Sequence, residues 1–415
     1  MFLIFRKLLT GGLSLNGMKT NTDSKKIQEI LSRNVEEIYS RENLERKLKS
    51  GERLRIKLGF DPTGSKIHIG RAVILRKLKA FQDLGHKIIF IAGDFTAKVG
   101  DPSDKMERRP ALSDEEIKRN LKDYKKQIGK ILNLSKTEFK FNSKWLKKLR
   151  FEDIIDLAGI FSVQQTLNRR NFKERYEKGR EISLKEFLYP LMQGYDSVAI
   201  KADVELGGSD QIFNLLAGRD VQKHYKQKEQ DVLTVKMLEG TDGRKMSTSW
   251  GNVINITDGP DDMFGKIMSL KDELIIKYFE LCTNLSQEKI NEMSGRLEKG
   301  ENPKNLKMAL AKEIVSLYHN AGSANKAEKN FVKVFSNKET PDGLLVVSVL
   351  SGNKLADLLL KNEIIVSKSD FKRLVESGSI TDMTDNSKVS DFNFEVKKTT
   401  VFKIGKHRFI KISII

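Results

Sequence analysis

The chain contains 415 residues, and its 75 lysine and arginine residues outnumber 56 aspartate and glutamate residues, giving a formal net charge of +19. This length accommodates two or three domains, and the basic balance favours polyanionic partners. Cys282 is the one cysteine, which excludes an internal disulfide and a structural zinc cluster, and no apolar run reaches transmembrane length. We therefore expect a cytoplasmic protein without membrane attachment.

Residues 1–23 are predicted to form an N-terminal tail. The segment is basic and apolar at its start and contains no acidic residue before Asp23. A disordered tail or a start at Met18 is favoured over an organelle-targeting segment, although the composition also allows the latter. Residues 24–50 are rich in charge and are predicted to form a pair of helices.

A β-α-β unit is predicted next. Residues 54–58 alternate in polarity as a strand does, and the turn cluster 61–64 ends that strand. Helical spacing then runs from His68 to Gly85, and the apolar run 88–92 predicts a second, parallel strand. His68 is thus placed at a helix N-terminus, where free N–H groups and the helix dipole favour phosphate. An ordinary turn with a surface histidine is the alternative.

A helix is predicted after Ser183, because Ser183 and Glu186 form a capping-box pattern. Tyr189, Gln193 and Asp196 follow at spacings i, i+4 and i+7, so they share one helix face and can converge on one small ligand. The alternative is a helix face at a subunit contact.

Two further loops follow predicted strands. Residues 207–211 join a strand end at 204–206 to helical spacing from Ile212, and their glycines allow close approach of a ligand to the backbone. Such turns are generic. The second loop, Lys245-Met246-Ser247-Thr248-Ser249, follows a strand at 232–235 and is basic. Together with the His68 loop it indicates an ATP site.

The C-terminal part is predicted to be helical first and mixed afterwards. Residues 258–335 carry apolar side chains at helical spacing, which we interpret as core, and Thr340-Pro341-Asp342-Gly343 is the predicted linker. A short helix from Leu355 is then expected.

The last predicted elements are a basic helix and strands. The helix is predicted to be capped by Ser369 and stopped by Gly378, and strand-like alternation follows at 392–396 and 401–412. A small lid with surface lysines is the alternative to an RNA-binding module.

Five motifs in order carry a resemblance to a known family. His68-Ile69-Gly70-Arg71 and Lys245-Met246-Ser247-Thr248-Ser249 resemble the two signatures of class I aminoacyl-tRNA synthetases. With residues 100–103, 189–196 and 207–211, the chain resembles the bacterial tyrosyl-tRNA synthetases over residues 25–415.

The resemblance implies an α/β fold with a Rossmann-type parallel sheet, a helical domain and a small α+β S4-like RNA-binding domain. The implied domains are a catalytic domain at 24–257 with an inserted helical segment at about 105–190, an anticodon-arm domain at 258–338 and the S4-like domain at 345–415.

The resemblance also implies a reaction. L-Tyrosine would be activated by ATP with Mg²⁺ to tyrosyl-adenylate and then transferred to tRNA(Tyr), by a homodimer joined through the region 130–190. No protein-bound metal is expected, because nucleotide-bound Mg²⁺ needs no protein cage.

The implied site residues fall into four groups. The catalytic group is Thr63, His68, Lys245, Lys105 and Arg109, and the ATP-binding group is Gly59, Asp61, His68, Gly70, Arg71, Asp210, Lys245, Met246, Ser247 and Thr248. The tyrosine-binding group is Lys57, Asp101, Tyr189, Gln193, Asp196 and Gln211, and the RNA-binding group is Lys368, Lys372 and Arg373. Within the third group, Asp196 is implied to accept a hydrogen bond from the phenol hydroxyl, while Tyr189 and Gln193 hold the ammonium with Asp101 as its charge partner.

Four residues depart from the family pattern. Arg71 and Thr248 replace a histidine and a lysine of the signatures, Lys57 stands where several members have a tyrosine, and Asp104 replaces a glycine. Two other functions stay open at this point: a tryptophanyl-tRNA synthetase, and a non-catalytic RNA-binding relative.

Overall fold

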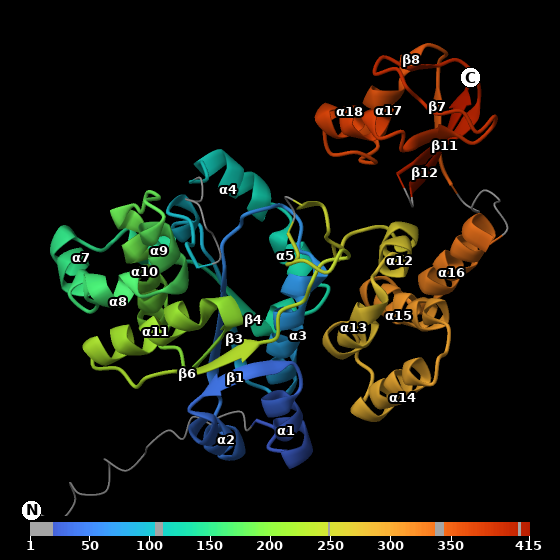
Figure 1. Cartoon of the computed structure of the whole chain (residues 1–415). Helices are drawn as coiled ribbons and strands as arrows, with labels where there is room; N and C mark the ends of the chain where they lie inside the picture. The colour runs from blue at the N-terminus through green and yellow to red at the C-terminus, as the bar shows by residue number, and fades with distance from the viewer. Residues whose placement is uncertain (1–19, 104–110, 248–249, 337–343, 406–407) are drawn as a thin grey trace, which may run out of the picture. The chain divides into compact units, whose positions relative to one another are not determined.

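The computed structural model describes residues 20–103, 111–247, 250–336, 344–405 and 408–415 (Figure 1). The predictions made for Lys105, Arg109, Thr248 and nearly all of the N-terminal tail lie outside these ranges. The chain divides into two compact units, Met1–Leu238 and Glu239–Ile415. No helix in the described ranges is long and apolar enough to cross a membrane.

The first unit is built on a six-stranded sheet in the order β1-β6-β5-β2-β3-β4. Its strands are β1 (Val35–Tyr39), β2 (Arg55–Phe60), β3 (Lys87–Ala92), β4 (Thr137–Phe141), β5 (Val204–Gly208) and β6 (Asp231–Val235). All neighbours run parallel except β1, which pairs antiparallel with β6. The predicted α/β class with a parallel sheet is therefore confirmed.

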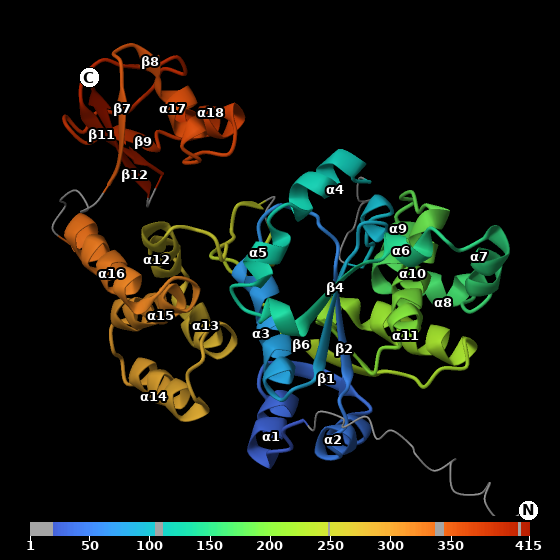
Figure 2. The same cartoon turned by 180° about the vertical axis from the view of Figure 1, so that it is seen from behind.

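Helices cover both faces of this sheet. They are α1 (Ser24–Ser32), α2 (Arg41–Lys49), α3 (Ile69–Asp83), α4 (Asp114–Leu121), α5 (Tyr124–Ile128), α6 (Ser143–Leu146), α7 (Phe151–Ala158), α8 (Val163–Leu167), α9 (Arg170–Glu177), α10 (Leu184–Ile200) and α11 (Ile212–His224), with 3-10 turns η1 (Thr96–Lys98), η2 (Leu134–Lys136) and η3 (Ser209–Gln211). Figures 1 and 2 show α3 on one side of the sheet and α10 with α11 on the other.

The predicted β-α-β unit is present as β2, α3 and β3, and its two strands are parallel. The predicted strand-loop-helix turn is β5, η3 and α11, and the predicted capping box opens α10, where the Ser183 N–H donates to the Glu186 carboxylate at 2.9 Å. The prediction for residues 24–50 was incomplete. Strand β1 lies between the two helices there, and its partner β6 is distant in sequence.

The strand order places a topological switch point, the expected position of a ligand crevice, at the junction of β2 and β5. From β2 the chain adds β3 and β4 on one side, and it then crosses to add β5 and β6 on the other side. The loops that follow β2 and β5 therefore diverge at this point, and ligands of open parallel sheets bind at such topological switch points. Several side chains of the first unit that are described below lie in the loops and helices that follow these strands.

The second unit begins with the helical stretch predicted from the sequence. Its elements are α12 (Pro260–Met268), η5 (Asp272–Leu274), α13 (Ile275–Cys282), α14 (Gln287–Glu298), α15 (Pro303–Tyr318) and α16 (Ala321–Ser336). Met263, Ile267, Phe279, Leu310 and Ile314 are all buried, so the interpretation of this apolar periodicity as core is confirmed. Cys282 is buried.

A small α+β region completes the second unit. It contains β7 (Leu345–Val349), β8 (Asn353–Lys354), α17 (Leu355–Lys361), α18 (Lys368–Glu376), β9 (Ile380–Asp382), β10 (Glu395–Val396), β11 (Thr400–Ile404) and β12 (Arg408–Ile414). The main sheet has the order β7-β12-β11-β9, with β7 parallel to β12, and β10 pairs with β8. A core of buried residues from both helices and the sheet holds this region together.

Three details of this region differ from the sequence-based predictions. The cap of α18 is Ser367 rather than Ser369, because the Ser367 hydroxyl accepts from the Asp370 N–H at 3.1 Å. The alternating run 401–412 forms two antiparallel strands, since Gly405 has a φ of 65° and turns the chain between them. Strands β7, β8 and β9 were not predicted.

Candidate active site

The loop after β2 and the start of α3 bring three predicted residues together. His68 is the N-cap of α3, and its Nδ1 accepts from the Arg71 N–H at 3.3 Å. The Arg71 guanidinium donates to Thr63 Oγ1 and to the Tyr124 hydroxyl, each at 2.7 Å. Arg71, which departs from the family signature, therefore holds the loop through Thr63 and anchors it to α5. Thr63 is exposed and His68 half-buried, so both can meet a ligand at the helix N-terminus.

Asp61 connects this loop to α10. The Tyr189 hydroxyl donates to Asp61 Oδ2 at 2.9 Å, and the Thr96 hydroxyl donates to Asp61 Oδ1 at 2.7 Å. Gly93 faces the same carboxylate so closely that a Cβ would collide with it. One residue predicted for ATP and one predicted for tyrosine are thus in direct contact.

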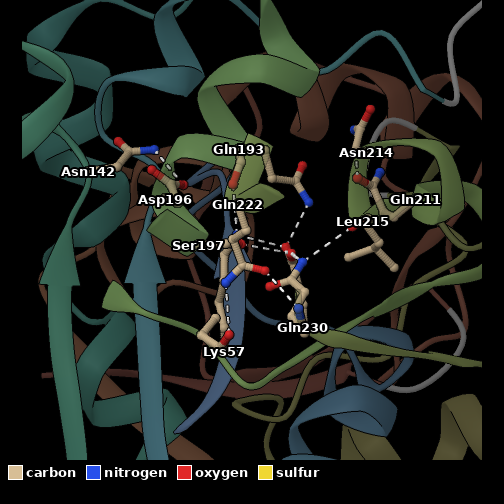
Figure 3. A network of polar contacts seen from close by, with 12 residues as sticks. Lys57, Asn142, Gln193, Asp196, Ser197, Gln211, Asn214, Leu215, Gln222 and Gln230 are labelled. Carbon is tan, nitrogen blue, oxygen red and sulfur yellow. Dashed lines mark hydrogen bonds and ion pairs between the residues drawn. The ribbon is translucent and has the colours of Figure 1, made fainter. Parts of the chain in front are cut away.

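Asp196 on α10 is buried with a donor on each carboxylate oxygen. The Trp145 Nε1–H donates to Oδ1 at 2.7 Å. Asn142 Nδ2 lies 3.3 Å from Oδ2 (Figure 3). Burial raises the pKa of Asp196 to about 7, although the Lys57 ammonium and these two donors oppose the shift. A carboxylate with this pKa can be ionised near neutral pH and still accept a further hydrogen bond.

Asn142 and Trp145 were not predicted as site residues. Both follow the end of β4, where Asn142 also contacts Thr96. The alternating residues 137–141 were the available signal, because polar residues at the carboxyl end of a parallel strand lie at the ligand-binding edge of the sheet.

Asp101 lies in a second polar cluster at the end of β5. Gln211 Nε2 donates to Asp101 Oδ2 at 2.7 Å, and Asn214 Nδ2 is 3.4 Å from Oδ1. Asn214 and the buried Arg169 both donate to Ser103 Oγ at 3.0 Å. Two predicted tyrosine-site residues, Asp101 and Gln211, are therefore brought together. Burial lowers the pKa of Arg169 to about 10, with Asp101 opposing the shift.

Lys57 and Gln193 belong to a third cluster, between β2, β5 and α10. The fully buried Lys57 ammonium contacts the Glu205 carboxylate at 2.9 Å and the Ser197 hydroxyl at 2.8 Å. It also donates to the backbone carbonyl oxygen of Gln193 at 2.8 Å. These contacts use all three N–H donors of the ammonium. We therefore assign Lys57 to supporting the residues around it rather than to contacting the substrate directly.

The remaining predicted nucleotide residues are described within their own units. Gly59 and Gly70 lie near the end of β2 and in the first turn of α3, and Asp210 is half-buried in η3. In the second unit, Lys245 forms a β-bridge with Glu239, and Asn252 closes the loop by accepting from the Ser247 N–H at 2.8 Å.

Polar side chains around this second loop bind one another through hydrogen bonds and an ion pair. Asn252 Nδ2 donates to Asp242 Oδ1 at 2.8 Å, and Arg244 binds the same aspartate while its guanidinium lies 5.0 Å from the Trp250 ring. These donors hold the pKa of Asp242 well below its usual range. Met246 is buried.

The predicted RNA-binding residues lie on or beside α18. Lys368 pairs with Asp357 at 2.9 Å, Arg373 pairs with Asp370 at 2.7 Å, and the Lys372 ammonium lies 5.4 Å from the centre of the Phe392 ring. These cations are solvent-facing.

Comparison with known proteins identifies the family. Residues 48–336 match the family model described as tRNA synthetases class I (W and Y). The chain is 47% identical over 388 residues to the tyrosine–tRNA ligase of Thermotoga maritima, covering 92% of this chain and 96% of that protein. It is 48% identical over 399 residues to the tyrosine–tRNA ligase of Carboxydothermus hydrogenoformans, covering 92% and 97%. The chain belongs to the class I tyrosine–tRNA ligase family.

Solved structures agree on the fold. A C-terminally truncated mitochondrial tyrosyl-tRNA synthetase of Aspergillus nidulans aligns with a TM-score of 0.63 at 21% identity, over 75% of this chain and 94% of that one. The tyrosyl-tRNA synthetase of Archaeoglobus fulgidus, solved with L-tyrosine, aligns with a TM-score of 0.58 at 22% identity, over 73% and 99%. The family model and the two tyrosine–tRNA ligases confirm the family resemblance inferred from the sequence motifs.

Proposed function

We propose that this synthetase activates L-tyrosine with ATP and transfers the tyrosyl group to tRNA(Tyr), with the phenol recognised by Asp196. In the first step the tyrosine carboxylate attacks the α-phosphorus, and the bond to pyrophosphate breaks. In the second step a hydroxyl of the terminal tRNA ribose attacks the tyrosyl carbonyl carbon, and AMP leaves. The observation that carries this proposal is the buried carboxylate of Asp196, held by Trp145 and Asn142 from the segment that follows β4.

Asp196 explains the choice of tyrosine over phenylalanine. Each of its oxygens has one donor within the protein and capacity for another. The tyrosine hydroxyl supplies that donor, whereas phenylalanine would leave the buried carboxylate without it and without water. The desolvation penalty of a buried acceptor position left unfilled then falls on the wrong substrate.

The ammonium and carboxylate of tyrosine are assigned to neighbouring residues. Tyr189, Gln193 and Asp101 hold the ammonium, and Gln211 lies towards the carboxylate. Support comes from the contact between Gln211 and Asp101 at 2.7 Å and from the position of Tyr189 against Asp61 at 2.9 Å. These contacts hold the polar groups in fixed orientations before the ligand binds, which lowers the ordering cost.

ATP is assigned to the N-terminus of α3 and the loop that precedes it. Thr63, His68 and Arg71 offer donors and positive charge there, with Asp61, Gly59 and Gly70 in the same loop and helix turn. Mg²⁺ would arrive with the nucleotide, and Asp210 is assigned to the adenylate. On sequence alone we also assign Lys245, Met246, Ser247, Thr248, Lys105 and Arg109 to ATP. Among these residues, the cations Lys245, Lys105 and Arg109 would act mainly by stabilising negative charge that develops in the transition state.

The assembly and the RNA partner are proposed as well. Phe151 and Leu184, with 78% and 80% of their surface exposed, lie with Ile155, Val163 and Tyr176 on or beside helices α7 to α10. These exposed apolar residues favour a second copy of the chain as partner, within the predicted contact region 130–190. The charges of α18 are assigned to tRNA, and a cytoplasmic location stays a prediction.

Pyrophosphate exchange with each of the twenty amino acids tests the function. Exchange with tyrosine alone is expected. Exchange with tryptophan instead would favour a tryptophanyl-tRNA synthetase, which the same family model covers. Tight tRNA binding without any exchange would favour a non-catalytic RNA-binding protein.

A further inference from the structure

A buried ion pair lies at the join of β2 and β5. Lys57 and Glu205 are aligned partners in the parallel register, so their side chains leave the sheet on the same face. Their charged atoms are 2.9 Å apart, and the exposed fractions of the two side chains are 0% and 1%. A buried pair of this kind is costly unless further hydrogen bonds satisfy both groups.

The Glu205 carboxylate is surrounded by four donors. Oε1 accepts from Lys57 Nζ and from Gln193 Nε2 at 3.0 Å. Oε2 accepts from Ser197 Oγ at 3.2 Å and from Gln230 Nε2 at 2.5 Å. A carboxylate has about four acceptor positions, so these donors fill them. Glu205 therefore has no remaining capacity for a substrate group.

Helix α11 leaves room for this arrangement. Gly218 faces the cluster, and a Cβ at that position would clash with Gln230 Nε2 and lie 3.2 Å from Glu205 Oε2. Gln230 is held in turn by its backbone N–H, which donates to Gln222 Oε1 at 2.7 Å. Gln230 is thus fixed by its own neighbours, and Figure 3 shows it beside Gln222 and Leu215.

The charge of Glu205 determines which end of the Gln193 amide turns away from the cluster. An ionised carboxylate only accepts hydrogen bonds, so Gln193 must direct its NH₂ group at Glu205. Figure 3 shows the amide nitrogen on the dashed contact and the amide oxygen turned away from the cluster. That oxygen is an acceptor, which is what a ligand ammonium requires.

We propose that Glu205, paired with Lys57, is a positioning residue that orients Gln193 so that its amide oxygen accepts from the substrate ammonium. This inference rests on the assignment of Gln193 to the ammonium in the proposed function. A neutral side chain at position 205 allows the Gln193 amide to rotate by half a turn. The ligand ammonium would then meet an NH₂ group, which repels it.

The test compares two inhibitors that differ in the ammonium. Tyramine has the phenol and the ammonium, and 3-(4-hydroxyphenyl)propionate has the phenol without the ammonium. Both are measured as competitors of tyrosine in pyrophosphate exchange. In Lys57→Met/Glu205→Gln, which removes both charges at similar side-chain size, the inhibition constant for tyramine should rise about tenfold. The constant for the propionate should stay within about twofold.

Glu205→Asp provides a second variant in case the double variant fails to fold, which thermal unfolding followed by circular dichroism would reveal. It keeps the charge opposite Lys57 but withdraws the carboxylate by one methylene, so the Gln193 contact is lost. The same selective loss for tyramine is expected. Gln193→Leu should give that loss too, and adding Glu205→Asp to it should give no further loss, because both changes remove one interaction.

Another buried ion pair of the same unit serves as a matched control. Arg175 and Glu186 are 2.8 Å apart, and the exposed fractions of their side chains are 0% and 3%. Arg175→Met/Glu186→Gln removes the same charges, and it should leave the ratio of the two inhibition constants unchanged. Equal weakening of both inhibitors in the Glu205 variants, or the same selective loss in the control, would overturn the inference. Absence of tyrosine-dependent exchange in the unmodified protein would instead overturn the proposed function.

Discussion

The polar clusters of the first unit and helix α18 of the second unit use charge in opposite ways. In these clusters, Asp196 and Glu205 are buried, and fixed donors surround both carboxylates. On α18, the side chains of Lys368 and Arg373 are 71% and 76% exposed and pair only across the surface. Buried polar groups form strong hydrogen bonds, and their fixed neighbours hold them in one orientation. Exposed ion pairs contribute about 1 kcal/mol or less to stability, and salt screens them.

This difference teaches which ligand each region suits. A small amino acid must be recognised by a few contacts, so each contact has to discriminate strongly. A long polyanion can be held by many weak contacts whose effects add, and its binding then depends on salt. The predictions below test this contrast, and the largest expected effect comes first.

Asp196→Ala should have the largest effect. Removing the buried acceptor leaves the tyrosine hydroxyl unpaired, together with Trp145 and Asn142, so kcat/KM for tyrosine should fall by about a thousandfold. Steady-state pyrophosphate exchange measures this, with the KM for ATP expected to stay within about twofold. Asp196→Asn is the matched variant of smaller effect. Unchanged discrimination against phenylalanine in Asp196→Ala would contradict the phenol assignment.

Lys245→Ala should act on the chemical step. If the ammonium stabilises charge that develops on the leaving pyrophosphate, the rate of adenylate formation should fall about a hundredfold while ATP affinity changes less than about threefold. Single-turnover kinetics over a range of ATP concentrations separates the two. Lys271→Ala is the control, because this exposed lysine faces Gly243 of the same loop. Equal losses in rate and affinity would argue against a transition-state role.

The pH profile should report Asp196 directly. Burial raises its pKa from 3.8 to about 7, so the carboxyl is neutral below pH 7 and ionised above it. Because the ionised form is the better acceptor, kcat/KM for tyrosine should rise about tenfold per pH unit up to pH 7 and then level off. Asp196→Asn should lose this rise, and the same profile in both proteins would assign it to another group.

The same group gives a stability prediction with a definite sign. Between pH 4 and pH 7 the folded protein keeps a proton on Asp196 that the unfolded chain has released. The free energy of unfolding should therefore fall as the pH rises through this window. Denaturant titrations of the unmodified protein and Asp196→Asn should show a smaller fall in the variant.

The α18 charges should give the smallest effect. Replacing Lys368, Lys372 and Arg373 by alanine should weaken tRNA binding by about three- to tenfold at 0.1 M salt and flatten its salt dependence. Pyrophosphate exchange should not change. The control replaces Lys354, Lys397 and Lys398, three cations of the same region outside α18. An equal loss in the control would show that net charge, rather than α18, attracts the RNA.

Local patterns predicted much of the fold. The β2-α3-β3 unit and the capping box of α10 follow from short-range signals that the structure keeps. Strand β1 could not be predicted in this way, because Val35–Tyr39 carries two glutamates and becomes a strand through pairing with β6. Ser367 and Ser369 are both acceptable caps by residue type, and only the backbone geometry selects Ser367.

The site was predicted less completely than the fold. Motifs pointed to Asp196 and Gln193, since their spacing places them on one helix face. They did not point to Trp145, Asn142 or Glu205, whose contacts arise when strands far apart in sequence meet at one edge of the sheet. The sequence showed that Lys57 differs from the residue usual in the family. Its role could not be predicted, because only the strand register places Lys57 beside Glu205.

The Lys57–Glu205 pair also bears on how the chain folds. Strands β2 and β5 are aligned through only two residue pairs, Ile56 with Val204 and Lys57 with Glu205. Sliding one strand by a single residue would turn the ammonium and the carboxylate to opposite faces, and each charge would be isolated in an apolar layer at a cost of several kcal/mol. The pair therefore penalises misaligned assembly of the two halves of the sheet, so variants that remove both charges should refold with more off-register species.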